Sequence, residues 1–267
     1  MKNSWLKFLW APLLLLLAAS ANGSDLAKEK RWREQIVDAL ISGEACPLKA
    51  GDTEFLGIYT GASDGPTGRA VVLLHGMGAH PDWPEVIHPL RTELPEHGWA
   101  TLSIQLPVLA NDAPLKDYAP LFDEAASRIA AAVDYLRKQD NETIVLVGHS
   151  LGASMAARYL AGKDAPPVDG FVAIGLSVIT LDDGMNSARA LEKIDIPVFD
   201  LYGSRDMDGV LASAGQRASA ARKAGNDDYR QQRIEGADHF FLGMQDTLVR
   251  TVYGWLRHRF VEPDPAP

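Results

Sequence analysis

The sequence predicts an α/β fold in which a mostly parallel sheet is covered by helices on both faces. Two observations predict this fold. Short apolar segments of strand length recur along the chain, and longer segments with helical spacing of apolar residues lie between them. Repeated alternation of strand and helix brings successive strands parallel. The strand segments are apolar at nearly every residue, as expected for strands that are buried on both faces.

The expected elements follow in chain order. A first strand at 53–59, closed by a turn rich in Gly, Asp and Pro, is expected to enter the sheet antiparallel. Parallel strands are expected at 70–74, 100–104, 143–147, 171–174 and 198–202, with a last strand at 229–234. Helices are expected at 122–137, 155–160, 210–223 and 247–259.

Residues 1–21 have the pattern of a secretory signal peptide. Two lysines are the only charges before Asp25, the run 6–19 is almost entirely apolar, and Ala19-Ser20-Ala21 has the small-x-small form of a cleavage site. A membrane anchor is the alternative, but the run is shorter than the ~20 residues that a spanning helix needs. We therefore expect export to the periplasm and no transmembrane segment after cleavage.

The remaining chain is expected to form one domain, residues 22–260. An amphipathic helix is expected at 26–41, packed on the domain by apolar residues at helical spacing: Trp32, Ile36, Val37, Leu40 and Ile41. A helix that binds a partner or lipid is the alternative. The proline-rich, acidic segment 261–267 is predicted to be a disordered tail.

Composition limits the classes of function. The chain has 267 residues, of which 46% are hydrophobic and 23% charged, as in ordinary globular proteins. Its formal net charge of −9 becomes −11 when Lys2 and Lys7 are removed with the signal, so nucleic acid is not an expected partner. Cys46 is the only cysteine, so the chain forms no internal disulfide. We expect a buried or partly buried thiol there; the alternative, a reactive thiol, has no neighbouring histidine or cation cluster to support it.

The segment Gly148-His149-Ser150-Leu151-Gly152 matches G-x-S-x-G, the nucleophile elbow. An apolar strand precedes Ser150, and a run of good helix formers follows it. Ser63 lies in a second match, but Pro66 and Gly68 follow it directly, so no helix can start there. Ser150 is therefore the candidate nucleophile and Ser63 a turn residue.

A serine nucleophile needs a base and an acid, expected in the chain order serine, acid, histidine. Asp206 follows the strand at 198–202, and His239 follows the last strand. Asp208 remains the alternative acid, whereas Asp200 lies inside its strand and is expected to be buried. His258 is expected to be solvated on the last helix.

The turn after the strand at 70–74 is expected to supply an oxyanion donor. The backbone N–H of Met77 is the first candidate, and the N–H of Leu151, at the start of a helix, is the second. His75 is expected to bond to loop backbone, and His80 and His88 to be loop or surface residues. No metal-ligand spacing such as H-E-x-x-H occurs, and we expect neither a metal nor a cofactor.

Four segments, "LLHGMG", "GHSLGA", "YGSRD" and "GADHFF", together resemble the α/β-hydrolase superfamily of serine hydrolases from about residue 53 to 260. Within it, "HGMGAHPDW" resembles a poorly characterised secreted bacterial group. The resemblance implies an eight-stranded, mostly parallel sheet with Ser150 as nucleophile, Asp206 as acid and His239 as base. The short segment between the strands at 171–174 and 198–202 leaves no room for a large lid domain.

The expected activity is that of a carboxylesterase or lipase-like serine hydrolase acting on a small or lipid-like ester through an acyl-enzyme. Among the members of the superfamily that the chain resembles, a serine at the elbow disfavours dehalogenases and epoxide hydrolases, which use aspartate, and dienelactone hydrolases, which use cysteine. A peptidase or acyltransferase with the same triad, and a catalytically silent binding protein of this fold, remain alternatives.

The walls of the substrate site are expected to come from loops. The apolar segment 105–122 is predicted to form an acyl-binding wall, with a plain surface loop as the alternative. Trp83 is expected to be either part of that wall or part of the core. The natural substrate, the acyl length and the oligomeric state stay open.

Overall fold

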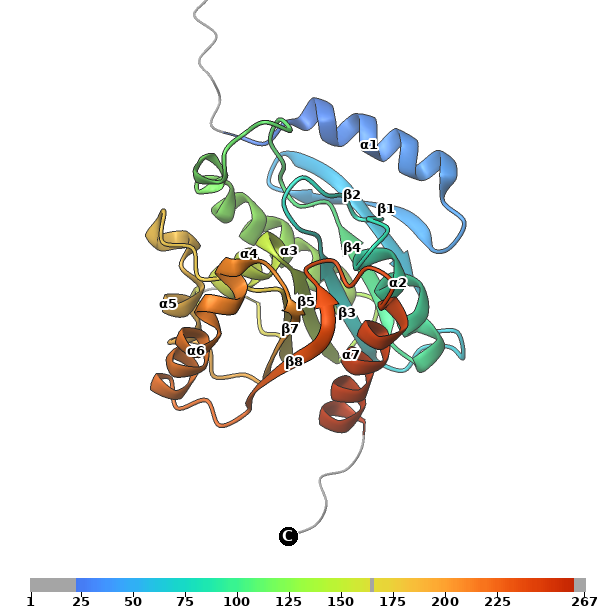
Figure 1. The fold of residues 1–267 in the computed structure, drawn as a ribbon. Coiled ribbons are helices and arrows are strands. Elements are labelled where there is room, and N and C mark those ends of the chain that lie inside the picture. Colours follow the sequence, from blue (N-terminus) through green and yellow to red (C-terminus); the bar gives the residue numbers. More distant parts are fainter. Residues whose placement is uncertain (1–22, 164–165, 262–267) are drawn as a thin grey trace, which may run out of the picture.

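The computed structural model describes residues 23–163 and 166–261, and its strands form one eight-stranded sheet in the order β1-β2-β4-β3-β5-β6-β7-β8 (Figure 1). β1 and β2 pair antiparallel, as do β2 and β4, and all other neighbours are parallel. This confirms the predicted fold class. The strands are β1 (Glu44–Ala50), β2 (Thr53–Thr60), β3 (Arg69–Leu74), β4 (Ala100–Ile104), β5 (Thr143–His149), β6 (Gly170–Ile174), β7 (Val198–Arg205) and β8 (Tyr229–Asp238).

Helices cover both faces of the sheet. The α-helices are α1 (Leu26–Ala39), α2 (Ile87–Glu93), α3 (Leu121–Arg137), α4 (Leu151–Leu160), α5 (Ser187–Leu191), α6 (Asp208–Lys223) and α7 (Gln245–Phe260). Short 3₁₀ segments are η1 (Leu94–His97), η2 (Leu115–Tyr118) and η3 (Asp183–Met185).

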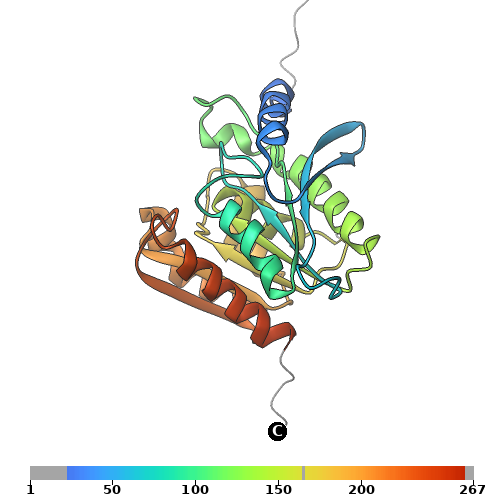
Figure 2. The same cartoon turned by 90° about the vertical axis from the view of Figure 1, so that its right-hand side faces the viewer.

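Side-chain alternation in β3 divides the core into two layers. Val72 and Leu74 point into a cluster with α3, α4 and α5, whereas Val71 and Leu73 point into a cluster with α2 and α7. Figure 2 shows α3 and α7 on opposite sides of the sheet. Burial on both faces explains why the central strands are apolar at nearly every residue.

Several elements differ from the prediction. β1, α2 and α5 were not expected, and α4 begins at Leu151 rather than at 155, because the helix starts at the elbow itself. α1 ends at Ala39, and Ile41 is fully exposed rather than packed on the domain. Val37 is also exposed, so the face of α1 that meets the domain is narrower than its apolar pattern predicted.

The predicted signal peptide, residues 1–21, and residues 262–267 of the predicted tail lie outside the described residues. Within 23–163 and 166–261, no helix combines the length and the apolar character that crossing a membrane requires.

The parallel strands carry their carboxyl ends to one edge of the sheet, where ligands bind in open α/β sheets. β3, β5, β7 and β8 each lead into a loop at this edge. The connection from β6 to β7 contains only η3 and α5, so the expected absence of a large lid domain at this place is confirmed.

Candidate active site

Ser150 occupies a strained turn between β5 and α4. Its backbone has φ 54° and ψ −121°, a region that residues with side chains rarely adopt. The Ser150 N–H donates to the Ile174 carbonyl at the end of β6 (2.8 Å), which fixes the turn to the sheet. This is the geometry of a nucleophile elbow, which lifts the hydroxyl above the sheet edge.

Two glycines make the turn sterically feasible. A Cβ at Gly148 would lie 2.6 Å from the Cα of Ala153, and a Cβ at Gly152 would overlap the carbonyl oxygens of Leu74 and His75. β5, α4 and the end of β3 therefore approach one another closely only because both positions lack a side chain.

Ser150, His239 and Asp206 come together from three loops. The Oγ of Ser150 lies 2.9 Å from Nε2 of His239, and Nδ1 of His239 lies 2.6 Å from Oδ1 of Asp206. Since a carboxylate can only accept, the hydrogen-bond pattern places the imidazole proton on Nδ1 and leaves Nε2 free to accept from the serine. This is the arrangement that nucleophilic catalysis by serine requires.

Asp206 is held as a carboxylate. Burial alone would raise its pKa, but the hydrogen bond from the His239 ring, electrostatic attraction between that ring and the carboxylate, and two backbone N–H groups hold the pKa below its usual value. Those N–H groups belong to Gly203 (3.2 Å) and Met207 (2.8 Å). Asp208 is exposed at the start of α6, so Asp206 is the carboxylate that meets His239. Asp200 is buried and paired with Arg217 (2.7 Å), as expected for a residue inside its strand.

His149 supports the same site and was not singled out by its sequence position. Its Nε2–H donates to the backbone carbonyl of His239 (2.9 Å), and the two rings lie 4.8 Å apart. Burial lowers the pKa of His149 to about 4, so the ring is neutral at pH 7. The only sequence signal was its place inside the G-x-S-x-G motif, where the pattern accepts any residue.

Gly175, just after β6, is a second residue that the sequence did not reveal. It has φ +62°, and a Cβ there would lie 2.9 Å from Cε1 and 3.0 Å from Nδ1 of His239. The missing side chain leaves the space in which the imidazole ring sits.

Gly175→Ala is therefore expected to lower kcat by about 10- to 100-fold, because displacing a reacting group by about 1 Å has effects of this size. Gly254→Ala is the matched control, since nothing lies within 4 Å of a Cβ at that helical position. Ester turnover and thermal unfolding of both variants check this. Unchanged turnover in Gly175→Ala would contradict the role of this space.

The two expected oxyanion donors flank the serine. Leu151 is the first residue of α4, so its N–H has no acceptor within its own helix, and the residue lines the cavity at Ser150. Met77 lies in the loop after β3 and lines the same cavity as Ser150 and Leu151. Both residues therefore lie at the cavity that contains Ser150, where the sequence predicts the oxyanion donors.

The cavity at the serine encloses about 320 Å³. Its walls are mainly apolar, and none of its lining residues is aspartate, glutamate, lysine or arginine: Gly76, Met77, Ala79, Trp83, Leu115, His149, Ser150, Leu151, Ser177, Ile179, Met207, His239 and Phe240. Met77, Met207 and Phe240 are also exposed, so the apolar surface continues from the cavity to its mouth. The sequence had indicated the side chains of Met77 and Leu151, Trp83 and the segment 105–122 as parts of these walls.

The segment 105–122 contributes less than predicted. Leu115 lines the cavity, whereas Leu106 and Val108 are buried in the core beneath it. One residue of the segment thus belongs to the cavity wall, whereas other apolar residues, among them Leu106 and Tyr118, pack in the core cluster with α3.

The remaining candidates have positions outside the triad. Ser63 is exposed in a turn, as expected, and His258 is exposed on α7. Cys46 is half-buried on β1, and burial raises the pKa of its thiol. Within the described residues, no cluster of three or more His, Cys, Asp or Glu side chains is arranged to hold a metal ion.

The sheet order, the elbow and the three-residue constellation define an α/β-hydrolase fold, and solved structures agree. Est1E from Butyrivibrio proteoclasticus is 16% identical (TM-score 0.61; 83% of this chain and 100% of that chain covered). A dienelactone hydrolase from Anabaena variabilis is 20% identical (0.63; 82% and 98%), and a Pyrococcus furiosus esterase is 15% identical (0.65; 84% and 94%). These likenesses confirm the fold.

The chain belongs to the family described as "Protein of unknown function (DUF3530)", which matches residues 19–126 and 120–258. A search among curated proteins finds no match.

Proposed function

We propose that this protein is a serine hydrolase that cleaves carboxylic esters through Ser150, His239 and Asp206. The observation that carries the proposal is the hydrogen-bonded sequence from Ser150 Oγ to His239 Nε2 and from His239 Nδ1 to Asp206 Oδ1, at 2.9 and 2.6 Å. A serine hydroxyl is a weak nucleophile until a base accepts its proton, and this geometry supplies the base and the group that orients it.

The proposed mechanism has two half-reactions. Ser150 attacks the ester carbonyl while His239 takes its proton, and Asp206 stabilises the imidazolium. The N–H groups of Met77 and Leu151 donate to the oxyanion, and the protonated His239 then gives its proton to the departing alcohol. Water, deprotonated by His239, attacks the acyl-enzyme in the same way and releases the acid.

Labelling with a fluorophosphonate is the direct test of this proposal. An activated Ser150 displaces fluoride from phosphorus, and the added mass is expected on the peptide that contains Ser150 and to be absent from Ser150→Ala. Folded protein that is not labelled would favour the alternative of a silent binding protein. A panel with peptide and alcohol acceptors separates an esterase from a peptidase or an acyltransferase that uses the same triad.

The cavity favours an uncharged acyl group. Its lining offers no cation to a charged substrate, and burying an unpaired carboxylate is strongly unfavourable. We expect kcat/KM for the p-nitrophenyl ester of butyric acid to exceed that for the mono-p-nitrophenyl ester of succinic acid by about 10-fold or more, because only the latter brings a charge into the cavity. Steady-state kinetics with this matched pair provide the measurement. Equal values would show that the acyl group lies elsewhere.

The signal-like pattern of residues 1–21 supports a further part of the proposal, export to the periplasm. The mass of the mature protein recovered from a bacterial host tests it: cleavage after Ala21 is expected.

A further inference from the structure

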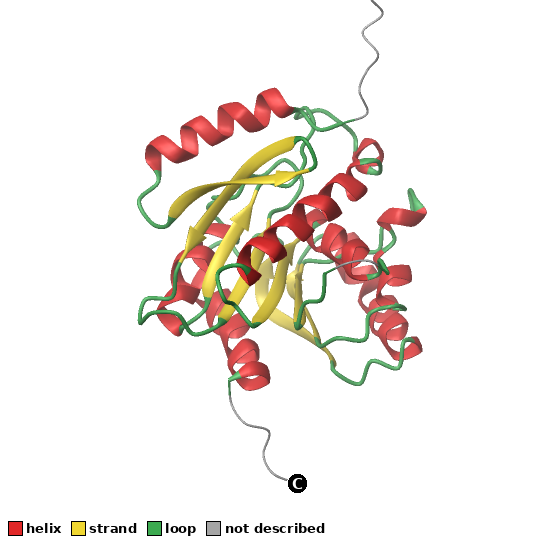
Figure 3. Ribbon diagram, turned by 180° about the vertical axis from the view of Figure 1, so that it is seen from behind, coloured by secondary structure: helices red, strands yellow, loops and turns green. Residues whose placement is uncertain are grey.

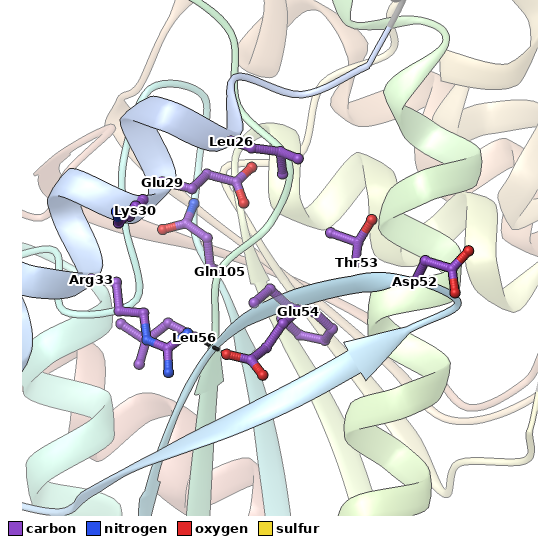
Figure 4. Close-up of a pocket in the computed structure, with 10 residues that line it drawn as sticks. Leu26, Glu29, Lys30, Arg33, Asp52, Thr53, Glu54, Leu56 and Gln105 are labelled. Carbon is purple, nitrogen blue, oxygen red and sulfur yellow. Dashed lines mark hydrogen bonds and ion pairs between the residues drawn. The ribbon is translucent and has the colours of Figure 1, made fainter.

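Helix α1 is attached to the domain by an apolar cluster, in which Ile36 packs on Leu56 and Ile58 of β2, and by polar contacts of its first turns. Its buried residues are Lys28, Glu29 and Ile36, so two of the three carry charge. Figure 3 shows α1 lying across the β1–β2 hairpin. A cavity of about 330 Å³ remains between α1 and β2, bridged at one end by the exposed pair of Arg33 and Glu54 (Figure 4). Because buried charges are unfavourable unless they are paired, the partners of the Glu29 carboxylate help to fix the position of α1 on the domain.

Glu29 binds a fully buried arginine of α3. Its two carboxylate oxygens accept from Nη1 (2.8 Å) and Nη2 (3.2 Å) of Arg128, and one of them also faces the N–H of Val108 (3.4 Å). Arg128 Nη1 in turn donates to the carbonyl of Gln105 (3.0 Å). Glu29 and Arg128 therefore fix the backbone of residues 105–108, which directly follows β4.

Residues 105 and 106 hold the ring of His75. The N–H of Leu106 donates to Nε2 of His75 (3.0 Å), and Nε2 of Gln105 lies 3.1 Å from the same atom. Because Nε2 accepts, the imidazole proton is on Nδ1, which donates to the carbonyl of Gly76 (2.9 Å). Burial lowers the pKa of His75 to about 3, so the ring stays neutral in this arrangement.

The carbonyl that His75 binds belongs to the same peptide group as the N–H of Met77. In a trans peptide the C=O and N–H bonds point in opposite directions. A hydrogen bond that fixes the carbonyl of Gly76 therefore also fixes the direction of the Met77 N–H, the donor expected to face the oxyanion.

We propose that α1 positions the oxyanion donor of this site. Glu29 and Arg128 fix the 105–108 backbone, this backbone fixes His75, and His75 orients the peptide that carries the Met77 N–H. This inference rests on the proposed function. None of these three side chains lines the cavity at Ser150, so they are positioning residues rather than catalytic ones.

A second connection runs from α1 to the cavity wall. The ring of Trp32 packs edge-on against His80 (5.5 Å), and His80 packs edge-on against Trp83 (5.2 Å), which lines the cavity. α1 thus contacts the loop after β3 directly through Trp32 and is connected to it indirectly through Glu29, Arg128 and the 105–108 backbone.

The test compares two amide substitutions at His75. In His75→Asn the amide nitrogen can take the place of Nδ1 and still donate to the Gly76 carbonyl. In His75→Gln the amide group takes the place of Nε2, so the hydrogen bond to the Gly76 carbonyl is lost. We expect His75→Asn to stay within about threefold of the wild-type kcat and His75→Gln to lose about 10-fold or more, with KM changed less than about twofold, because the oxyanion donor acts in the transition state.

A boronic acid inhibitor gives a readout that a general structural role would not change. It forms a tetrahedral adduct on the serine and resembles the transition state, so its affinity for His75→Gln is expected to fall by the same factor as kcat/KM. The alcohol with the same carbon chain as the boronic acid forms no adduct with the serine and serves as a ground-state competitive inhibitor. Its affinity is expected to be the same for His75→Gln and the wild type.

Variants of α1 extend the test. Glu29→Ala is expected to lower kcat and the affinity for the boronic acid together. Arg33→Ala, on the same helix, is the matched control: it removes only the exposed ion pair with Glu54, and both quantities are expected to stay unchanged. Glu29→Asp withdraws the carboxylate from Arg128 and Val108, and carries the same comparison if the alanine variant does not fold.

Equal kcat values for His75→Asn and His75→Gln, or wild-type kcat in folded Glu29→Asp, would overturn the positioning role while Ser150 labelling and wild-type turnover persist. A wild type that shows neither labelling nor turnover would overturn the proposed function, and this inference with it.

Discussion

Ser150→Ala and His239→Ala are each expected to lower kcat/KM toward a carboxylic ester by about 10³-fold or more. The reason is geometric: Ser150 Oγ and His239 Nε2 are 2.9 Å apart and act as one unit, in which neither is useful without the other. The two effects are therefore not expected to add: the double variant should have about the same kcat/KM as the less active of the two single variants. Steady-state kinetics of the three variants, with thermal unfolding to establish that each is folded, provide the measurement.

Ser63→Ala is the matched control for this experiment, because Ser63 lies in the other G-x-S-x-G match but is exposed in a turn. It is expected to retain wild-type activity. A double variant of Ser150 and His239 that falls far below both single variants would show that the two residues act independently, and the assigned mechanism would then be wrong.

The central sheet could be predicted because each of its strands is marked in the sequence by a short run of apolar residues, which is typical of a buried strand. Each of the strands from β3 to β7 is apolar on both faces and is separated from the next by a segment with helical spacing or a turn. β1 could not be predicted: it is an edge strand, contains Pro47 and two charged residues, and pairs only with β2. The five residues of α5 are too few to show a helical period.

The meeting of Ser150, His239 and Asp206 could be predicted, because these residues follow strands that end at the same edge of the sheet. His149, Gly175 and the contact between Glu29 and Arg128 could not. The last two residues are 99 positions apart, and their meeting depends on how α1 crosses the sheet, which no local pattern reveals. Gly175 is one glycine among 23, and what distinguishes it is that a Cβ at this position would lie against the imidazole of His239.

The assignment of Asp206 rather than Asp208 as the acid that orients His239 predicts a second large effect on kcat. Asp206→Asn is expected to lower kcat by about 10³- to 10⁴-fold, because an amide in place of the carboxylate allows the imidazole proton to move to Nε2, which then cannot accept from Ser150. Asp208→Asn, at the exposed start of α6, is expected to stay within about threefold of wild type, since surface substitutions rarely disturb a site. The two variants change one carboxylate each and are two residues apart, so they form a matched pair.

Both should be compared by kcat at pH 7 and by thermal unfolding. If Asp208→Asn is the inactive variant, the Nδ1 contact of 2.6 Å to Asp206 does not represent the catalytic pair, and the acid must be reassigned.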